Sequence, residues 1–275
     1  MLDARPRLGS KMKVLITGAR GWLGKAITEV VASEHAVRAF DLARSDIPVE
    51  PLDLSEGVEI ESSPGSITDY IGIRAAMDGQ DAVIHAAVRS TFAHGHYRAG
   101  EAEPFDVNVR GTFNVFEAAR EAGVNRVIFI ASAEVHVPHA PGELVTGDTP
   151  YRGQPEDIYD LTKHLQEEVG VWFADVYGME VIGLRLGDIV DVKLGRSKWG
   201  DDDWERSMRE DAWIDRYDVG RACLGGLKLQ MSGYRRYHLV GAPGARDVFD
   251  VERTEADLGI QITTEFDRCP AGKRL

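Results

Sequence analysis

A glycine-rich loop between an apolar run and a helical pattern constrains the fold of this chain more than any other stretch. Residues 13–17 read KVLIT, residues 18–24 read GARGWLG, and apolar side chains then recur at helical spacing through residues 26–31. The three loop glycines permit a tight turn and a close approach of the backbone to a ligand. The helix that follows would direct its N-terminal N–H groups at a pyrophosphate. The loop therefore predicts a dinucleotide site at the first strand-to-helix connection of an α/β protein.

Apolar runs and amphipathic stretches alternate from this loop as far as Arg185, a pattern typical of a parallel sheet covered on both faces. The fold class is therefore α/β: a doubly wound parallel sheet (Rossmann fold) in residues 12–185, completed by 213–241. Residues 186–212 and 242–275 are predicted to form a small substrate-binding cap. The expected strands are 13–17, 37–41, 58–62, 81–87, 126–131 and 180–185. The expected helices are 70–77, 105–122 and 158–177. The second of these helices has an apolar stripe of Val109, Thr112, Phe113, Phe116 and Ala119.

Composition excludes several functional classes. The 32 Lys+Arg residues against 45 Asp+Glu give a net charge of −13 without a basic stripe, which argues against nucleic-acid and membrane-surface partners. No apolar run reaches the roughly 18 residues that a membrane span needs, and the first eleven residues hold no signal-peptide core. Cys223 and Cys269 form neither a disulfide framework nor a metal-site spacing, so we expect a cytoplasmic protein.

An acidic residue at the end of the second expected strand bears on the choice of cofactor. Asp41 lies 23 residues after Gly18, where a carboxylate can accept hydrogen bonds from the adenosine ribose hydroxyls and repels a 2′-phosphate. NAD is therefore favoured over NADP. Arg44, three residues further on, is the side chain that would counter this preference by binding a phosphate.

Tyr159 and Lys163 lie four residues apart in the expected helix 158–177, so they share one helical face. A phenol has a pKa of about 10, and a nearby ammonium lowers it. Such a pair can pass protons to and from an alcohol or carbonyl. Ser132 follows the strand 126–131 at its carboxyl end, where a hydroxyl can stabilise charge that develops on an alkoxide. Taken alone, the spacing is common by chance and favours a surface lysine that packs over a half-buried tyrosine; the rest of the chain must support catalysis.

Several ordered motifs together resemble the extended branch of the short-chain dehydrogenase/reductase superfamily, the NAD-dependent epimerase/dehydratase family, over about residues 13–229. The motifs are Thr17-Gly18-x-x-Gly21-x-x-Gly24, Asp41, His85-Ala86-Ala87, Asn108-Val-Arg-Gly-Thr112, Ser132-Ala-Glu-Val135, Tyr159-x-x-x-Lys163 and Leu184-Arg185.

The resemblance implies a role for each matching residue. Tyr159 would be the catalytic acid/base, Lys163 would hold the nicotinamide ribose and lower the pKa of the tyrosine, Ser132 would bind the reacting oxygen, and Asn108 would help to build the site. The expected cofactor-binding residues are Gly18, Arg20, Gly21, Trp22, Leu23, Gly24, Asp41, Ile67, His85, Ala86, Ala87, Asn108, Tyr159 and Lys163. The expected substrate-contacting residues are Arg89, Ser132, Ala133, Glu134, Arg185 and Asp188.

The chain also departs from this family's pattern. Ser66 replaces the acid that reads the adenine amino group, and Ala133-Glu134 replaces the Asp-Glu pair of the dehydratases, so sugar dehydration is disfavoured. His136 stands where a tyrosine is usual, and residues 187–190 (GDIV) replace an Asn-Val-Tyr-Gly motif. The short stretch between Arg185 and Trp213 resembles the cap of uronate dehydrogenases and favours a small polar substrate over a nucleotide sugar.

Other side chains have two interpretations each. Arg185 suits a substrate carboxylate through its planar fork, or a buried ion pair. Trp199 and Trp204 suit a lid over the substrate, or packing of the cap. The resembled family commonly forms a dimer through helices equivalent to 105–122 and 158–177, so we expect a homodimer. No metal site is predicted, because His94 and His96, and likewise Glu134, His136 and His139, lack the ligand spacing of a structural zinc site.

Three functional hypotheses follow. The first is an NAD-dependent oxidoreductase that acts on a hydroxyl of a sugar or sugar acid. The second is an NAD-dependent sugar epimerase, in which the same residues return the hydride to the other face of the substrate. The third is a non-catalytic NAD-binding regulatory protein, against which the complete serine–tyrosine–lysine set argues.

Overall fold

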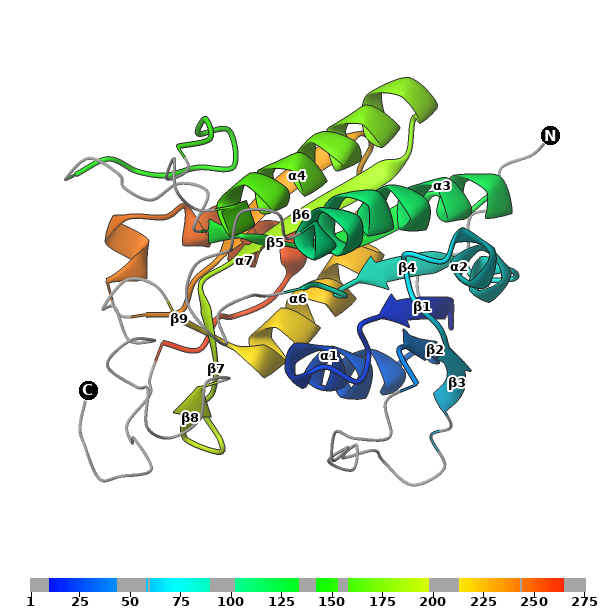
Figure 1. The fold of residues 1–275 in the computed structure, drawn as a ribbon. Helices are drawn as coiled ribbons and strands as arrows, with labels where there is room; N and C mark the ends of the chain where they lie inside the picture. The colour runs from blue at the N-terminus through cyan, green and yellow to red at the C-terminus, as the bar shows by residue number, and fades with distance from the viewer. Residues whose placement is uncertain are drawn as a thin grey trace.

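A seven-stranded, entirely parallel sheet forms the centre of the molecule (Figure 1). The computed structural model describes residues 10–43, 58, 60–89, 102–133, 142–152, 158–197, 213–242 and 244–264. The strand order β3-β2-β1-β4-β5-β6-β10 reverses direction between β1 and β4, which confirms the predicted doubly wound fold. The strands are β1 (Lys13–Thr17), β2 (Ala36–Asp41), β3 (Ile60–Pro64), β4 (Ala82–His85), β5 (Arg126–Ser132), β6 (Glu180–Leu186) and β10 (Tyr234–Leu239).

Helices cover both faces of the sheet, and alternate residues of each strand supply the two hydrophobic cores. In β1, Val14 and Ile16 belong to one core cluster, whereas Leu15 belongs to the other. The first face carries α1 (Trp22–Ala32), α6 (Arg216–Lys228) and α7 (Val251–Leu258), and the second carries α2 (Tyr70–Met77), α3 (Thr112–Ala122) and α4 (Ile158–Tyr177).

The helix expected at residues 105–122 is two elements. It starts as a π-helix, η1 (Phe105–Gly111), and continues as α3. A π-turn holds more residues than an α-turn and rotates the following side chains around the axis. The predicted apolar stripe is wrong in one member: Phe113 is 46% exposed, while Val115 and Ala118 of the same helix are fully buried.

A second, three-stranded sheet follows β6, and it begins in the residues 186–212 that were predicted to belong to the cap. It consists of β7 (Asp188–Asp191), β8 (Arg196–Ser197) and β9 (Trp213–Asp215), in the order β8-β7-β9. Residues 213–215 pair in this sheet, and Trp213 and Ile214 also belong to the core cluster that β1, α1 and α6 share. The predicted division into a nucleotide-binding domain and a cap remains a prediction. The pairing of β7 with β9 joins segments more than twenty residues apart, which local sequence patterns do not reveal, whereas β7 and β8 are neighbours in the sequence.

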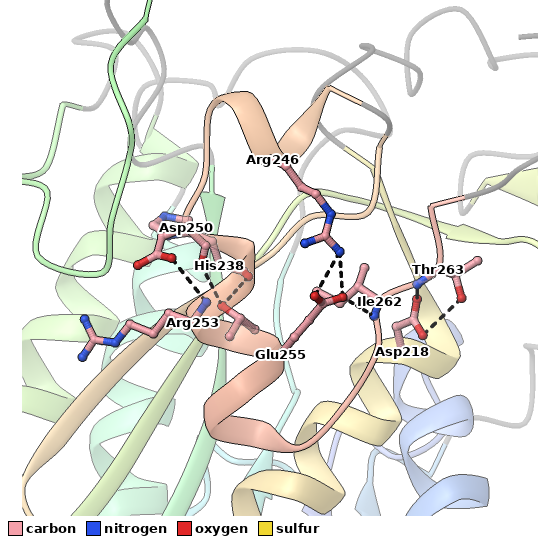
Figure 2. Close-up of polar contacts among 9 residues, drawn as sticks. Asp218, His238, Arg246, Asp250, Arg253, Glu255, Ile262 and Thr263 are labelled. Carbon is pink, nitrogen blue, oxygen red and sulfur yellow. Dashed lines mark hydrogen bonds and ion pairs between the residues drawn. The ribbon is translucent and has the colours of Figure 1, made fainter.

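Residues 244–264, the last described segment, pack against the main sheet and share its hydrophobic core. Figure 2 shows the polar contacts of this segment: the Arg246 guanidinium pairs with Glu255 at 2.9 Å, and Glu255 also accepts from the Ile262 backbone N–H at 2.8 Å. The backbone N–H of Thr263 donates to the Asp218 carboxylate of α6 at 2.8 Å. Val251, Leu258 and Ile262 share the core cluster of α1 and α6. No helix among the described residues is long and apolar enough to cross a bilayer.

Candidate active site

The predicted dinucleotide loop lies between β1 and α1 and is closely packed against its own backbone. Gly18 has φ +70°, and a Cβ at Gly24 would lie 1.9 Å from the Gly18 carbonyl oxygen. Gly21 caps α1 without a side-chain hydrogen bond, and the first turn of α1 contains no acidic residue. The N–H groups of this helix end therefore remain suited to an anion, and the loop geometry fits a pyrophosphate.

Asp41 lies at the carboxyl end of β2 with its carboxylate fixed beside the loop. Its two oxygens accept from the backbone N–H groups of Arg20 and Leu42, each at 2.7 Å. The Arg20 guanidinium in turn donates to the Ser62 hydroxyl at 2.9 Å. This geometry places an anionic acceptor next to the loop, as expected for a residue that binds ribose hydroxyls. Arg44 lies outside the described residues.

Tyr159 and Lys163 lie on the first turns of α4, with the lysine turned into the protein. The Lys163 side chain is 2% exposed, and its ammonium nitrogen is 5.9 Å from the centroid of the Tyr159 ring. The same nitrogen donates to the carbonyl oxygen of Ile130 on β5 at 2.7 Å. Ser132, which is 5% exposed, ends that strand two residues later. The fold thus brings the three predicted catalytic residues to the same end of β5.

A series of buried side chains joined by hydrogen bonds, here called the polar chain, leads from Lys163 on α4 to Thr17 at the end of β1. The ammonium donates to the Gln166 amide oxygen at 2.8 Å, and the Gln166 amide nitrogen donates to the Thr112 hydroxyl at 2.6 Å. His85 Nε2 lies 2.9 Å from the same hydroxyl, and His85 Nδ1 lies 2.7 Å from the Thr17 hydroxyl. Burial, and next the positive charge of Lys163, lower the pKa of His85 to about 3, so its imidazole is neutral.

Gln166, Thr112 and Thr17 were not singled out as individual site residues in the sequence. The available signal for Gln166 was its spacing, since a residue three positions after Lys163 lies on the same helical face.

Asn108 is completely buried in η1 and binds the chain that follows β4. Its amide accepts from the backbone N–H of Arg89 at 2.8 Å and donates to the Arg89 carbonyl at 3.1 Å. It also donates to the Thr162 hydroxyl at 3.1 Å. Asn108 therefore fixes the segment after His85-Ala86-Ala87 against α4, and its predicted role in building the site remains a prediction with this geometric basis.

Arg185 does not face a substrate, and its predicted place among the substrate residues is wrong. The side chain is 4% exposed and forms a two-pronged ion pair with Glu167 of α4, at 2.8 and 2.6 Å. Arg236 adds a second guanidinium at 3.2 Å from Glu167, and Arg185 also donates to the Gly147 carbonyl at 3.2 Å. The alternative interpretation, a buried ion pair, is the one the structure shows.

The other predicted substrate residues line the same end of the sheet or lie outside the described chain. Arg89 is exposed and pairs with Glu103 at 3.1 Å, Ala133 is buried directly after Ser132, and Asp188 opens β7 half-buried. Among the described residues, no three His, Cys, Asp or Glu side chains are grouped so as to hold a metal ion. Outside the described residues lie Glu134, His136, His139, His94, His96, Trp199 and Trp204.

The predicted cofactor residues Ile67, Ala86 and Ala87 lie at the carboxyl edge of the sheet, near the loop. The carbonyl of Ile67 accepts from the Asn114 amide at 2.9 Å, and a Cβ at Gly18 would lie 2.6 Å from the Ala87 nitrogen. Trp22 stacks under the Arg216 guanidinium, whose carbon is 5.1 Å from the centroid of the ring. Ligands of this fold class bind at this edge of the sheet, so the cofactor-binding role of these residues remains a prediction with this geometric basis.

Curated relatives of this chain include sugar and sterol enzymes. The chain is 28% identical to the L-arabinose 1-dehydrogenase (NAD(P)(+)) of Haloferax volcanii, over 78% of this chain and 81% of that protein. It is 30% identical to the uronate dehydrogenase of Pseudomonas syringae pv. tomato, over 78% and 74%. It is 34% identical to sterol demethylase protein B of Methylococcus capsulatus, over 91% and 67%.

A solved structure and a family profile extend the comparison. A short-chain dehydrogenase/reductase superfamily protein from Agrobacterium tumefaciens with bound NAD superposes with a TM-score of 0.72 at 22% identity, over 94% of each chain. Residues 14–190 match the profile of the NAD dependent epimerase/dehydratase family. The described glycine loop and the Tyr159–Lys163 pair both fall within that range. The chain therefore belongs to the NAD-dependent epimerase/dehydratase family.

Proposed function

We propose that this protein is an NAD-dependent dehydrogenase that oxidises a hydroxyl of a sugar or sugar acid. One observation carries the proposal: the buried Lys163 ammonium lies 5.9 Å from the Tyr159 ring and 2.7 Å from the carbonyl oxygen of Ile130, two residues before Ser132 at the end of β5. A positive charge at this distance favours the phenolate over the phenol. The dinucleotide loop lies at the same edge of the sheet, on β1.

The reaction follows from these positions. Ser132 donates a hydrogen bond to the substrate oxygen and orients it, and Tyr159 as phenolate accepts the hydroxyl proton. Lys163 holds the positive charge that lowers the pKa of the phenol from its usual value of about 10. NAD, when bound, supplies the acceptor for the hydride that leaves the substrate carbon. The ring of contacts around Asn108 fixes the backbone at Arg89 and so supports the site.

The substrate class rests on the relatives and on the size of the cap. Two curated relatives act, by their names, on uronate and on L-arabinose, both small free sugars. The sterol relative makes a larger apolar alcohol the competing class. An epimerase is the remaining alternative, because it would use the same Tyr159 and Lys163 and leave no net reduction of the cofactor.

We also propose a preference for NAD and a homodimer. The Asp41 carboxylate, held by two backbone N–H groups, would lie against a 2′-phosphate and repel it. The surface of α3 and α4 exposes large apolar side chains, as a helix-to-helix interface between two copies would require. These residues are Phe113, Leu161, Trp172, Val176 and Tyr177. Light scattering that gives a monomer mass at micromolar concentration would contradict the dimer.

The test is a substrate screen followed at the nicotinamide absorbance. The full chain is incubated with NAD or NADP and with free pentoses and hexoses, uronic acids, nucleotide sugars and a 3β-hydroxysterol. Absorbance that rises steadily with a uronic acid or free sugar supports the proposal, while a response to the sterol alone overturns the substrate class. An isomerised product without reduced cofactor identifies the epimerase. Tyr159→Phe should lower kcat by about 10²- to 10⁴-fold, and full turnover by this variant contradicts the mechanism.

A further inference from the structure

The polar chain that starts at Lys163 is buried along its whole length. Lys163, Gln166, Thr112, His85 and Thr17 are each no more than 2% exposed. They come from four different elements, α4, α3, β4 and β1, so the chain links the catalytic helix to the strand that precedes the dinucleotide loop. Buried polar groups without partners destabilise a fold, so the direction of each hydrogen bond in this chain can be derived from its donors and acceptors.

The number of protons that each group carries determines which partner donates in each hydrogen bond of the polar chain. The Thr112 hydroxyl lies 2.6 Å from the Asn108 carbonyl oxygen, which can only accept, so the hydroxyl proton is directed there. The Thr112 oxygen must then accept from both the Gln166 amide nitrogen and His85 Nε2. His85 therefore carries its single proton on Nε2, and its Nδ1 accepts from the Thr17 hydroxyl. The Gln166 amide is oriented in the same step, with its oxygen toward Lys163.

We infer that Gln166 is a positioning residue for Lys163: it holds the ammonium next to Tyr159 through a neutral hydrogen bond. This inference rests on the proposed function. The amide nitrogen of Gln166 is anchored by Thr112, and the amide oxygen at 2.8 Å fixes the lysine at the end of β5. Because the amide carries no charge, the positive charge of Lys163 remains available to stabilise the phenolate. A carboxylate in the same place would offset that charge.

Several other charged groups on the elements around α4 are paired with one another. Asp160 is a buried carboxylate on α4, three residues before Lys163, and is common to all variants described below. His85 of β4 is neutral. Four carboxylates are paired as follows: Glu167 of α4 with Arg185 of β6 and Arg236 of β10, Asp106 with Arg110 on η1, Glu117 with Arg120 on α3, and Glu180 with Arg126 at the opposite end of β5. On α4 itself, Glu168 and Asp175 are exposed, and the His164 ring stacks on Tyr151. Burial raises the pKa of Tyr234 on β10 well above its usual value, so this phenol stays neutral.

The test replaces the amide in two ways and follows kcat/KM against pH. Gln166→Glu keeps the size of the side chain and adds a charge, and Gln166→Met keeps its length and removes both hydrogen bonds. Gln261→Glu makes the same chemical change at an exposed position and is the matched control. We expect the acidic limb of the profile to move to higher pH by about one to two units in Gln166→Glu. It should move less in Gln166→Met, and it should not move in the control.

Two measurements keep this test separate from the proposed function. In ¹⁵N spectra of the unliganded wild type, His85 should show the neutral Nε2–H form with no titration between about pH 5 and 9. An Nδ1–H form or a charged ring overturns the proton count. By calorimetry, NAD affinity should fall about tenfold in Gln166→Met, because Lys163 loses its fixed position.

Several outcomes contradict the inference directly. The inference is wrong if the acidic limb of kcat/KM against pH lies at the wild-type position in both Gln166 variants. It is also wrong if the NAD affinity of Gln166→Met is unchanged. If Gln166→Glu fails to fold, the acidic limb and the NAD affinity measured for Gln166→Met alone test the inference. A wild type that turns over no alcohol contradicts the proposed function, whereas the ¹⁵N and calorimetric results still test the role of Gln166.

Discussion

Replacing Glu167 with glutamine removes the carboxylate that two arginines share inside the protein. Glu167 and Arg185 expose 4% and 5% of their side chains, and two hydrogen bonds of 2.8 and 2.6 Å join them. Arg236 lies 3.2 Å from the same carboxylate but exposes 26% of its side chain. In the variant, Arg185 stays buried with a neutral amide and the Gly147 carbonyl as partners. Its charge is then uncompensated.

The expected loss of unfolding free energy in Glu167→Gln depends on how deeply Arg185 and Arg236 are buried. Removal of one partner of a buried ion pair costs about 3–5 kcal/mol of unfolding free energy. The lower end applies here, because Arg236 can turn toward water, so we expect a loss of about 3 kcal/mol. For a chain of this size that loss lowers Tm by about 6–12 °C. The assay is urea unfolding followed by far-UV circular dichroism, with a thermal scan as a second measurement.

A matched double variant separates charge from packing. Glu167→Leu combined with Arg185→Met removes both charges at similar volume, and such replacements are often neutral in stability. We therefore expect the double variant to be more stable than Glu167→Gln alone, despite its two substitutions. A loss below about 1 kcal/mol in Glu167→Gln, or a double variant less stable than the single one, would refute the buried-charge reasoning.

Three further predictions concern the cofactor site and the buried histidine. Gly24→Ala should abolish NAD binding in a calorimetric titration, because its Cβ would lie 1.9 Å from the Gly18 carbonyl oxygen; undiminished affinity would contradict the loop geometry. Asp41→Asn should raise kcat/KM with NADP relative to NAD, since the repelling charge is removed, and an unchanged ratio would argue against ribose recognition by this carboxylate. Burial and Lys163 lower the pKa of His85 from 6.5 to about 3, so its neutral form stabilises the fold above pH 6.5 and that stability is lost as the pH falls toward 3. His85→Gln should flatten the fall of unfolding free energy over this range, and an equally steep curve would show that other groups cause it.

Much of the sheet could be predicted because local patterns encode it. The runs at 13–17 and 126–131 are apolar, short and bounded by turn residues, and they became β1 and the first six residues of β5. The loop at 18–24 and the pair Tyr159 and Lys163 depend only on spacing along one strand-to-helix turn or one helical face. The small sheet of β7, β8 and β9 was missed because β9 is distant from β7 in the sequence and β8 has only two residues.

The charged residues of α4 show where sequence reasoning could have gone further. Tyr159, Lys163 and Glu167 follow one another at four-residue intervals, so a prediction that buries Lys163 also turns Glu167 toward the sheet. A carboxylate in that position requires a cation on the facing strand, and Arg185 is the basic residue of β6. The same spacing therefore predicts the ion pair and removes Arg185 from the substrate site. The spacing of Gln166 places it on the helical face of Lys163, but its role depends on Thr112 and His85, which only the fold brings within reach.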